Sequence, residues 1–204
     1  MAKFLKHVNS KYNISLKSYS DLHEWSISNI SDFWNTIWDY TKIIHSSYPT
    51  KIVDDINKMP GAEWFKDAKL NFSENLLRFK DEKKAIIFKN ETSYTVELTY
   101  YELFKEVTRV ASALKRSGIR PGDRIVGFLP NIPESVIAML ATASLGATWS
   151  SCSPDFGVRG TLDRFIQVKP KILFAANGYY YNGKLYHTIN KLNQIVQGLP
   201  TLIN

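Results

Sequence analysis

Two segments in the C-terminal half of the sequence carry side chains that could hold a phosphorylated ligand. The first, Trp149–Gly157, contains three Ser, one Cys and one Asp. It follows a predicted strand, and open α/β sheets bind their ligands beyond the carboxyl ends of strands. The second, Tyr179–Lys184, contains an Asn-Gly turn pair with a cation directly behind it. Pattern alone leaves two interpretations open for each segment, a phosphate contact or a solvated connection between elements.

The remaining signals for catalytic chemistry are few. The sequence lacks GxxxxGK[ST], GxGxxG, HExxH and GxSxG motifs. Cys152 could act as a nucleophile, but no His is near it in sequence, which favours a buried, inert thiol. One cysteine also excludes a disulfide framework. Since the histidines are widely spaced, we expect no metal site in this chain; they are His7, His23, His45 and His187.

A repeating strand–helix rhythm after Gly118 predicts the framework that would position these segments. Turn 120–124 leads into an apolar strand, and Pro133 is suited to the first turn of the following helix. Near-continuous apolar strands in series with helices indicate a parallel sheet covered on both faces, so the fold class is α/β. The predicted elements are strand 125–129, helix 133–145, strand 147–151, helix 161–168, strand 172–175 and helix 185–196.

Shorter patterns precede this region. Residues 72–77 predict a short capped helix, and 85–88 and 94–98 predict strands. Thr99 and Glu102 have capping-box spacing at the start of a helix that ends near Gly118. At the other end, Leu202–Asn204 resembles the start of a strand. A parallel sheet ending there would leave an apolar edge unpaired, so we expect the polypeptide to be incomplete.

The first 72 residues differ in composition, being rich in Asn, Ser, Lys and aromatic residues. Ser31 and Asp32 could cap a helix with a helically spaced apolar stripe. The stripe consists of Phe33, Ile37, Trp38, Thr41 and Ile44. We therefore divide the chain into an N-terminal helical cap segment, 1–72, and the first, incomplete part of an α/β domain, 73–204.

The bulk properties narrow the class of protein. The 204 residues carry 26 Lys and Arg against 19 Asp and Glu, a net charge of +7. No run of like charge or nucleic-acid motif accompanies this surplus, so we expect no nucleic-acid partner. The longest apolar stretch, Val136–Leu145, is too short to span a bilayer, and no signal peptide is evident. These features and the single cysteine favour the cytosol.

Several of these segments together resemble the adenylate-forming acyl-CoA synthetases, and among them the acetoacetyl-CoA synthetases. The resemblance covers residue 31 to the end. It rests on Trp64–Phe65 and Leu70–Leu77, on Leu98–Leu103 (LTYxEL), on Gly122–Ile125 and Pro130–Glu134 (GDRV…PNxPE), and on Ser150–Gly157 and Tyr181–Lys184.

This resemblance implies an acid–thiol ligase that uses ATP and Mg²⁺ to form an acyl-adenylate, then transfers the acyl group to CoA. The family's ATP-binding and catalytic motifs have no counterpart in these 204 residues, so the resemblance implies no catalytic residue in this chain. One site carries over, a CoA contact at Tyr181, Asn182, Gly183 and Lys184. Here the sequence has one cation where acetyl-CoA synthetases have two arginines, and lysine offers a point charge in place of a bidentate fork.

Alternatives remain open at this point. The acid could be acetoacetate or another short acyl acid, as in an acetyl- or propionyl-CoA synthetase. The chain could also be a non-catalytic truncated protein that binds CoA or pairs with a full-length ligase.

Overall fold

The computed structural model describes residues 1–203, which divide into two compact units, 1–70 and 71 to the end. The first contains α1 (Ala2–Tyr12), α2 (Tyr19–Ser28), α3 (Ile30–Tyr40), β1 (Lys51–Val53) and β2 (Trp64–Lys66). The second contains α4 (Phe72–Leu76), β3 (Lys84–Lys89), β4 (Thr95–Thr99), α5 (Tyr100–Arg116), β5 (Arg124–Phe128), α6 (Pro133–Ser144), β6 (Thr148–Cys152), α7 (Val158–Val168), β7 (Ile172–Ala175), β8 (Gly178–Tyr181), β9 (Lys184–His187) and α8 (Ile189–Gln197).

The first unit is built from three helices and a small antiparallel pair, β1–β2. Phe4 and Val8 of α1 and Leu22 of α2 form a buried cluster, against which Phe33 and Ile37 of α3 pack. Trp38, on the same helix, stacks on Phe65 with ring centroids 5.0 Å apart. The aromatic residues of this region therefore serve mainly to hold its helices and its β-pair together.

A three-stranded parallel sheet of order β6-β5-β7 forms the centre of the second unit. Central β5 bonds to both neighbours and is buried from Ile125 to Phe128. Because alternate residues of a strand face opposite sides, β5 supplies both cores. Ile125 joins the core beside α5 and α6, while Val126 and Phe128 join the core beside α7 and α8.

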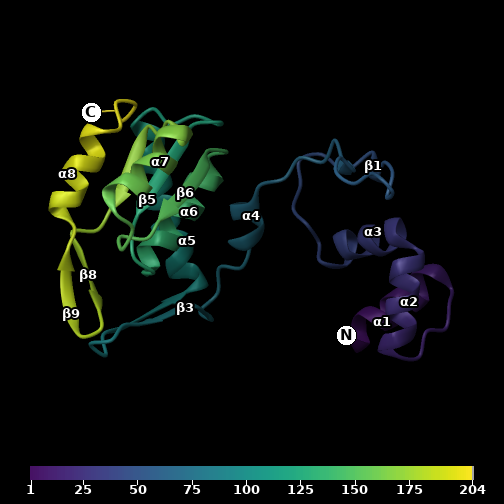
Figure 1. Cartoon of the computed structure of the whole chain (residues 1–204). Coiled ribbons are helices and arrows are strands. Elements are labelled where there is room, and N and C mark those ends of the chain that lie inside the picture. Colours follow the sequence, from purple (N-terminus) through teal and green to yellow (C-terminus); the bar gives the residue numbers. More distant parts are fainter. Residues whose placement is uncertain (204) are drawn as a thin grey trace. The chain divides into compact units, whose positions relative to one another are not determined.

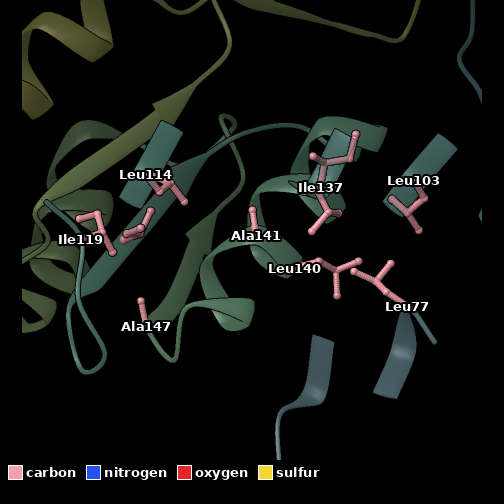
Figure 2. Packing of buried hydrophobic residues seen from close by; sticks show 10 residues of the cluster. Leu77, Leu103, Leu114, Ile119, Ile137, Leu140, Ala141 and Ala147 are labelled. Atoms are coloured by element: carbon pink, nitrogen blue, oxygen red, sulfur yellow. The ribbon is translucent and has the colours of Figure 1, made fainter. Parts of the chain in front are cut away.

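The larger core is formed chiefly where α5 and α6 meet. Leu103 and Leu114 of α5 pack with Ile137, Leu140 and Ala141 of α6. Figure 2 also shows Leu77, which follows α4, directed at Leu140. Ser73 of α4 is fully buried, and its hydroxyl donates to the carbonyl of Leu140 at 2.7 Å. The short helix α4 is thus held against α6 by both apolar packing and a buried hydrogen bond.

Two hairpins lie outside the parallel sheet, β3–β4 and β8–β9 (Figure 1). The antiparallel β3–β4 pair leads directly into α5. The predicted capping box begins that helix: Thr99 Oγ1 accepts from the Glu102 amide at 3.1 Å, and Glu102 Oε2 accepts from the Thr99 amide at 2.8 Å. The β8–β9 pair follows β7 and precedes α8.

The α/β class and the parallel sheet with flanking helices are confirmed, with corrections to individual elements. The predicted helix 185–196 is wrong at its start, since β9 occupies 184–187 and α8 begins at Ile189. Helix α3 begins after Asn29 and not at the Ser31–Asp32 pair. Residues 202 and 203 form no strand, and Asn204 lies outside the described residues. None of the described helices is long and apolar enough to cross a membrane.

Gly127 on β5 offers a test of this packing. A Cβ built there would lie 2.6 Å from Cζ2 and 2.7 Å from Cη2 of Trp149 on neighbouring β6. Overpacking of this kind costs about 1–3 kcal/mol. We expect Gly127→Ala to lower the free energy of unfolding by that amount in urea titrations.

Gly160 on α7 is the matched control, because a Cβ there would meet nothing within 4 Å. In a helix, Gly→Ala stabilises by up to about 1 kcal/mol. Loss of stability in Gly160→Ala equal to that in Gly127→Ala would contradict the packing explanation.

An ion pair ties the starts of β5 and β7 together. Lys171 Nζ lies 2.8 Å from Asp123 Oδ1, and the Arg120 amide donates to Asp123 Oδ2 at 2.8 Å. The hydrogen bond from Lys171, followed by that from the Arg120 amide, holds the pKa of Asp123 below its ordinary value. The resulting stabilisation is present above the ordinary aspartate pKa of about 4 and is lost as pH falls through the depressed value.

Asp123→Asn should therefore destabilise the protein at pH 7, and its unfolding midpoint should converge with wild type as pH falls below about 4. Urea titrations from pH 7 to pH 3 measure this convergence. Lys171→Met removes the ion-pair partner of Asp123 and should show part of the same convergence with wild type at low pH. Parallel pH curves for wild type and Asp123→Asn would rule out the linkage.

Candidate functional site

The predicted CoA-contact residues lie at the tip of the β8–β9 hairpin. Tyr181 pairs with Lys184 across the strands, and Asn182 and Gly183 form the two-residue connection. Both connecting residues have positive φ, 50° and 71°, as a type I′ turn requires. Asn and Gly tolerate this conformation best, so the Asn-Gly pair sets the register of the hairpin. The structure thus brings the four residues together, and the predicted turn is confirmed.

Glu91, at the tip of the β3–β4 hairpin, reaches this turn from a distant part of the sequence. Its Oε1 accepts from the Asn182 amide at 2.8 Å, and its Oε2 accepts from the Gly183 amide at 2.6 Å. In Figure 1 the tips of the two hairpins lie close together. Because both turn amides already donate to a carboxylate, they are not free to bind a phosphate.

With the turn amides occupied, the group at the tip that could bind a phosphate is the Lys184 ammonium. Its side chain is exposed, and among the described residues no ion pair is made with it. Tyr181 beside it is 65% exposed. The chemistry available to a ligand here is therefore one ammonium group flanked by an accessible aromatic ring, which suits a phosphate with an adjacent planar group.

Further down the hairpin, Tyr179 and Tyr186 stack with ring centroids 5.4 Å apart and an interplanar angle of 18°. Burial and then the nearby Asp155 carboxylate raise the pKa of Tyr179 above its ordinary value. This phenol therefore stays protonated, and it contributes a flat, neutral surface.

A groove of about 470 Å³ runs beside the hairpin base. Its walls come from the β3–β4 hairpin, the segment at the start of α6 and the first residues of β8. The segment at the start of α6 is Pro130–Glu134, which includes the first two residues of that helix and is one of the stretches that carried the family resemblance. The tip residues 181–184 lie outside this lining. The lining residues are Phe88, Lys89, Asn90, Glu91, Tyr94, Val96, Pro130, Asn131, Ile132, Pro133, Glu134, Gly178, Tyr179 and Tyr180.

The other predicted ligand segment, Trp149–Gly157, is used mainly for structure. Residues up to Cys152 belong to strand β6, and Cys152 is 3% exposed, so the buried-thiol interpretation is confirmed. In the loop that follows, the Pro154 carbonyl accepts from Lys191 Nζ at 3.0 Å, and the Arg164 guanidinium lies 4.5 Å from the Phe156 ring. These contacts favour a connector bound to α7 and α8.

Sequence reasoning missed Glu91. The residue lies in a turn of Asn, Glu, Thr and Ser that precedes Tyr94, which by pattern is an ordinary polar connection. Its partners are backbone amides about ninety residues later. Local periodicity carries no signal for such a contact, and only the placement of the two hairpins shows it.

In the part of the chain that the structure describes, no group of three His, Cys, Asp or Glu side chains is arranged to hold a metal ion.

Two family models match the chain in sequence order. The acetyl-coenzyme A synthetase N-terminus model matches residues 19–76, and the AMP-binding enzyme model matches residues 72–202. Acetoacetyl-CoA synthetases from Macaca fascicularis and Rhizobium meliloti are each 42% identical to it, over 99% and 100% of this chain. A malonamoyl-CoA synthetase from Penicillium aethiopicum is also 42% identical, over 99%.

A solved structure, that of acetoacetyl-CoA synthetase from Streptomyces lividans, matches with a TM-score of 0.91 at 38% identity. The match covers 98% of this chain and 32% of that protein. The chain spans about 30% of the length of the curated relatives. Since the AMP-binding model accounts for well over half of the chain, and the relatives align along nearly all of it, the chain belongs to the AMP-binding enzyme family and is homologous to acetoacetyl-CoA synthetases.

Proposed function

We propose that this chain is the N-terminal portion of an acetoacetate–CoA ligase. The observation that carries the proposal is the continuous likeness to acetoacetyl-CoA synthetases, in sequence along the whole chain and in structure with a TM-score of 0.91. The reaction would activate acetoacetate with ATP and Mg²⁺ as an acyl-adenylate and then form the thioester with CoA. Residues 1–72 would form the helical cap segment, and 73–204 the first part of the AMP-binding domain.

Within that reaction we assign Lys184 the role of contacting a CoA phosphate. When bound, CoA supplies the thiol that accepts the acyl group. The hairpin fits this role because Lys184 is exposed at the tip, without an ion-pair partner among the described residues, and beside accessible Tyr181. Asn182 and Gly183 would contribute by shaping the turn, since Glu91 occupies their amides. We expect no catalytic residue in the chain itself.

The choice of acid rests on the names of the similar relatives. Malonamoyl-CoA synthetase is as similar to this chain as the acetoacetyl-CoA synthetases are. Identity over these residues therefore does not discriminate between two short acids that share a carbonyl at the β-position. Acetoacetate is proposed because most of the similar relatives are named for it. A cytosolic location stays a prediction.

The first experiment is mass spectrometry of the endogenous protein, with a search for peptides beyond Asn204. We expect such peptides, and we expect purified 204-residue chain to show no acetoacetate-dependent pyrophosphate exchange. A native C-terminus at Asn204 would overturn the ligase proposal for this protein. Its function would then be sought in binding CoA or pairing with a full-length ligase.

A second experiment tests the CoA contact in the native ligase polypeptide. An exposed ion pair contributes up to about 1 kcal/mol, so Lys184→Ala should raise KM for CoA about fivefold. Acetoacetate-dependent pyrophosphate exchange precedes thioester formation and should stay unchanged.

Lys115→Ala serves as the control, because it removes a lysine that lies on α5, away from the hairpin, and it should alter neither assay. Equal loss of both activities in Lys184→Ala would refute the assignment, because a CoA contact has no part in adenylate formation.

A further inference from the structure

The contact between the two hairpin tips consists of two hydrogen bonds that together fix the position of the Asn182–Gly183 turn. Two consecutive turn amides, of Asn182 and Gly183, converge on the two oxygens of a single carboxylate, that of Glu91. Successive N–H groups in a turn form a concave donor pair that prefers an anion. Hydrogen bonds with an ionised acceptor are shorter and stronger than those between neutral groups.

The loop that carries Glu91 is held by several hydrogen bonds of its own. Asn90 Oδ1 accepts from the amides of Thr92 and Tyr94, each at 3.0 Å, and from Thr92 Oγ1 at 2.8 Å. The Asn90 amide in turn donates to the Tyr94 carbonyl at 3.1 Å. Glu91 therefore extends from a turn whose backbone is held on both sides, and its carboxylate has a defined position.

The β8–β9 hairpin has little else to hold its tip. Its two strands pair only with each other among the described strands, and all four residues of β9 are exposed. Its base is tied, because the Thr188 amide donates to the Asn177 carbonyl at 3.0 Å and Thr188 Oγ1 donates to the Ala176 carbonyl. Isolated two-stranded hairpins are marginally stable, so a contact at the tip matters disproportionately.

We infer that Glu91 is a positioning residue for the CoA contact: it fixes the Asn182–Gly183 turn and thereby the point from which the Lys184 side chain extends. The inference rests on the proposed function of Lys184. Positioning and charge predict opposite effects of Glu91 on CoA binding. A carboxylate near Lys184 should repel a phosphate, so charge alone predicts that its removal strengthens CoA binding. Positioning predicts that its removal weakens CoA binding.

The structural part is tested by hydrogen exchange. In Glu91→Ala the amides of Asn182 and Gly183 should exchange about tenfold faster, in line with the loss of a charge-assisted hydrogen bond. Amides of β5 should not change. Glu97→Ala removes a carboxylate from the same hairpin, one paired with Lys84 and not with the turn, and should leave 182 and 183 unaffected. Unchanged exchange at both amides in Glu91→Ala would overturn the inference.

The functional part uses KM for CoA in the native ligase polypeptide. Glu91→Ala should raise it about three- to fivefold, with pyrophosphate exchange unaltered. Glu91→Gln is neutral but keeps one acceptor oxygen, so its KM should fall between wild type and Glu91→Ala. A lowered KM in both variants would mean that charge dominates and would refute the positioning role.

The double variant Glu91→Ala/Lys184→Ala separates this inference from the proposed function. If Glu91 acts through Lys184, the double variant should resemble Lys184→Ala alone. Normal CoA kinetics in Lys184→Ala would defeat the proposed contact, whereas fast exchange at 182 and 183 in Glu91→Ala would still establish the anchor. Additive effects of the two substitutions would show that Glu91 acts independently of Lys184 and would refute the positioning role.

Discussion

Burial of strand β5 on both faces is the constraint on which the second unit depends. Each of its neighbours, β6 and β7, hydrogen-bonds to it, and its alternating side chains enter two separate cores. A strand in this position needs apolar residues on both faces of the sheet, and a small residue wherever a bulky side chain of the adjacent strand lies against it. Ile125, Val126 and Phe128 meet the first need, and Gly127 meets the second by making room for the Trp149 indole.

This constraint explains why the sheet could be predicted from sequence. A strand buried on both faces appears as an uninterrupted apolar run, and Pro133 and Gly146 mark the limits of the helix that follows. The Thr99–Glu102 capping box was equally local, since both of its hydrogen bonds lie within four residues. Where burial or capping is decided by neighbouring residues, the sequence pattern contains the necessary information.

The peripheral elements were harder to predict from the sequence, and the physical reason differs from one element to the next. Leu185 and Tyr186 fit a helical stripe as well as a strand, and exposed β9 is a strand only because β8 lies beside it. Of the candidate site, the Asn-Gly turn and the exposed lysine followed from residue types. The carboxylate of Glu91 did not, because its partners are main-chain amides, which every sequence offers and no side-chain pattern distinguishes.

The placement of the β8–β9 hairpin outside the parallel sheet has a consequence for how this family can diversify. The side chains at its tip contact solvent and pack against neither core, so substitutions at 181 and 184 carry little risk of unfolding the domain. Substitution can therefore change the charge and shape that the tip presents to solvent, provided that the turn pair and its carboxylate are kept. The hairpin is thus an appendage whose exposed side chains can vary in evolution while the two cores that hold the domain together stay unchanged.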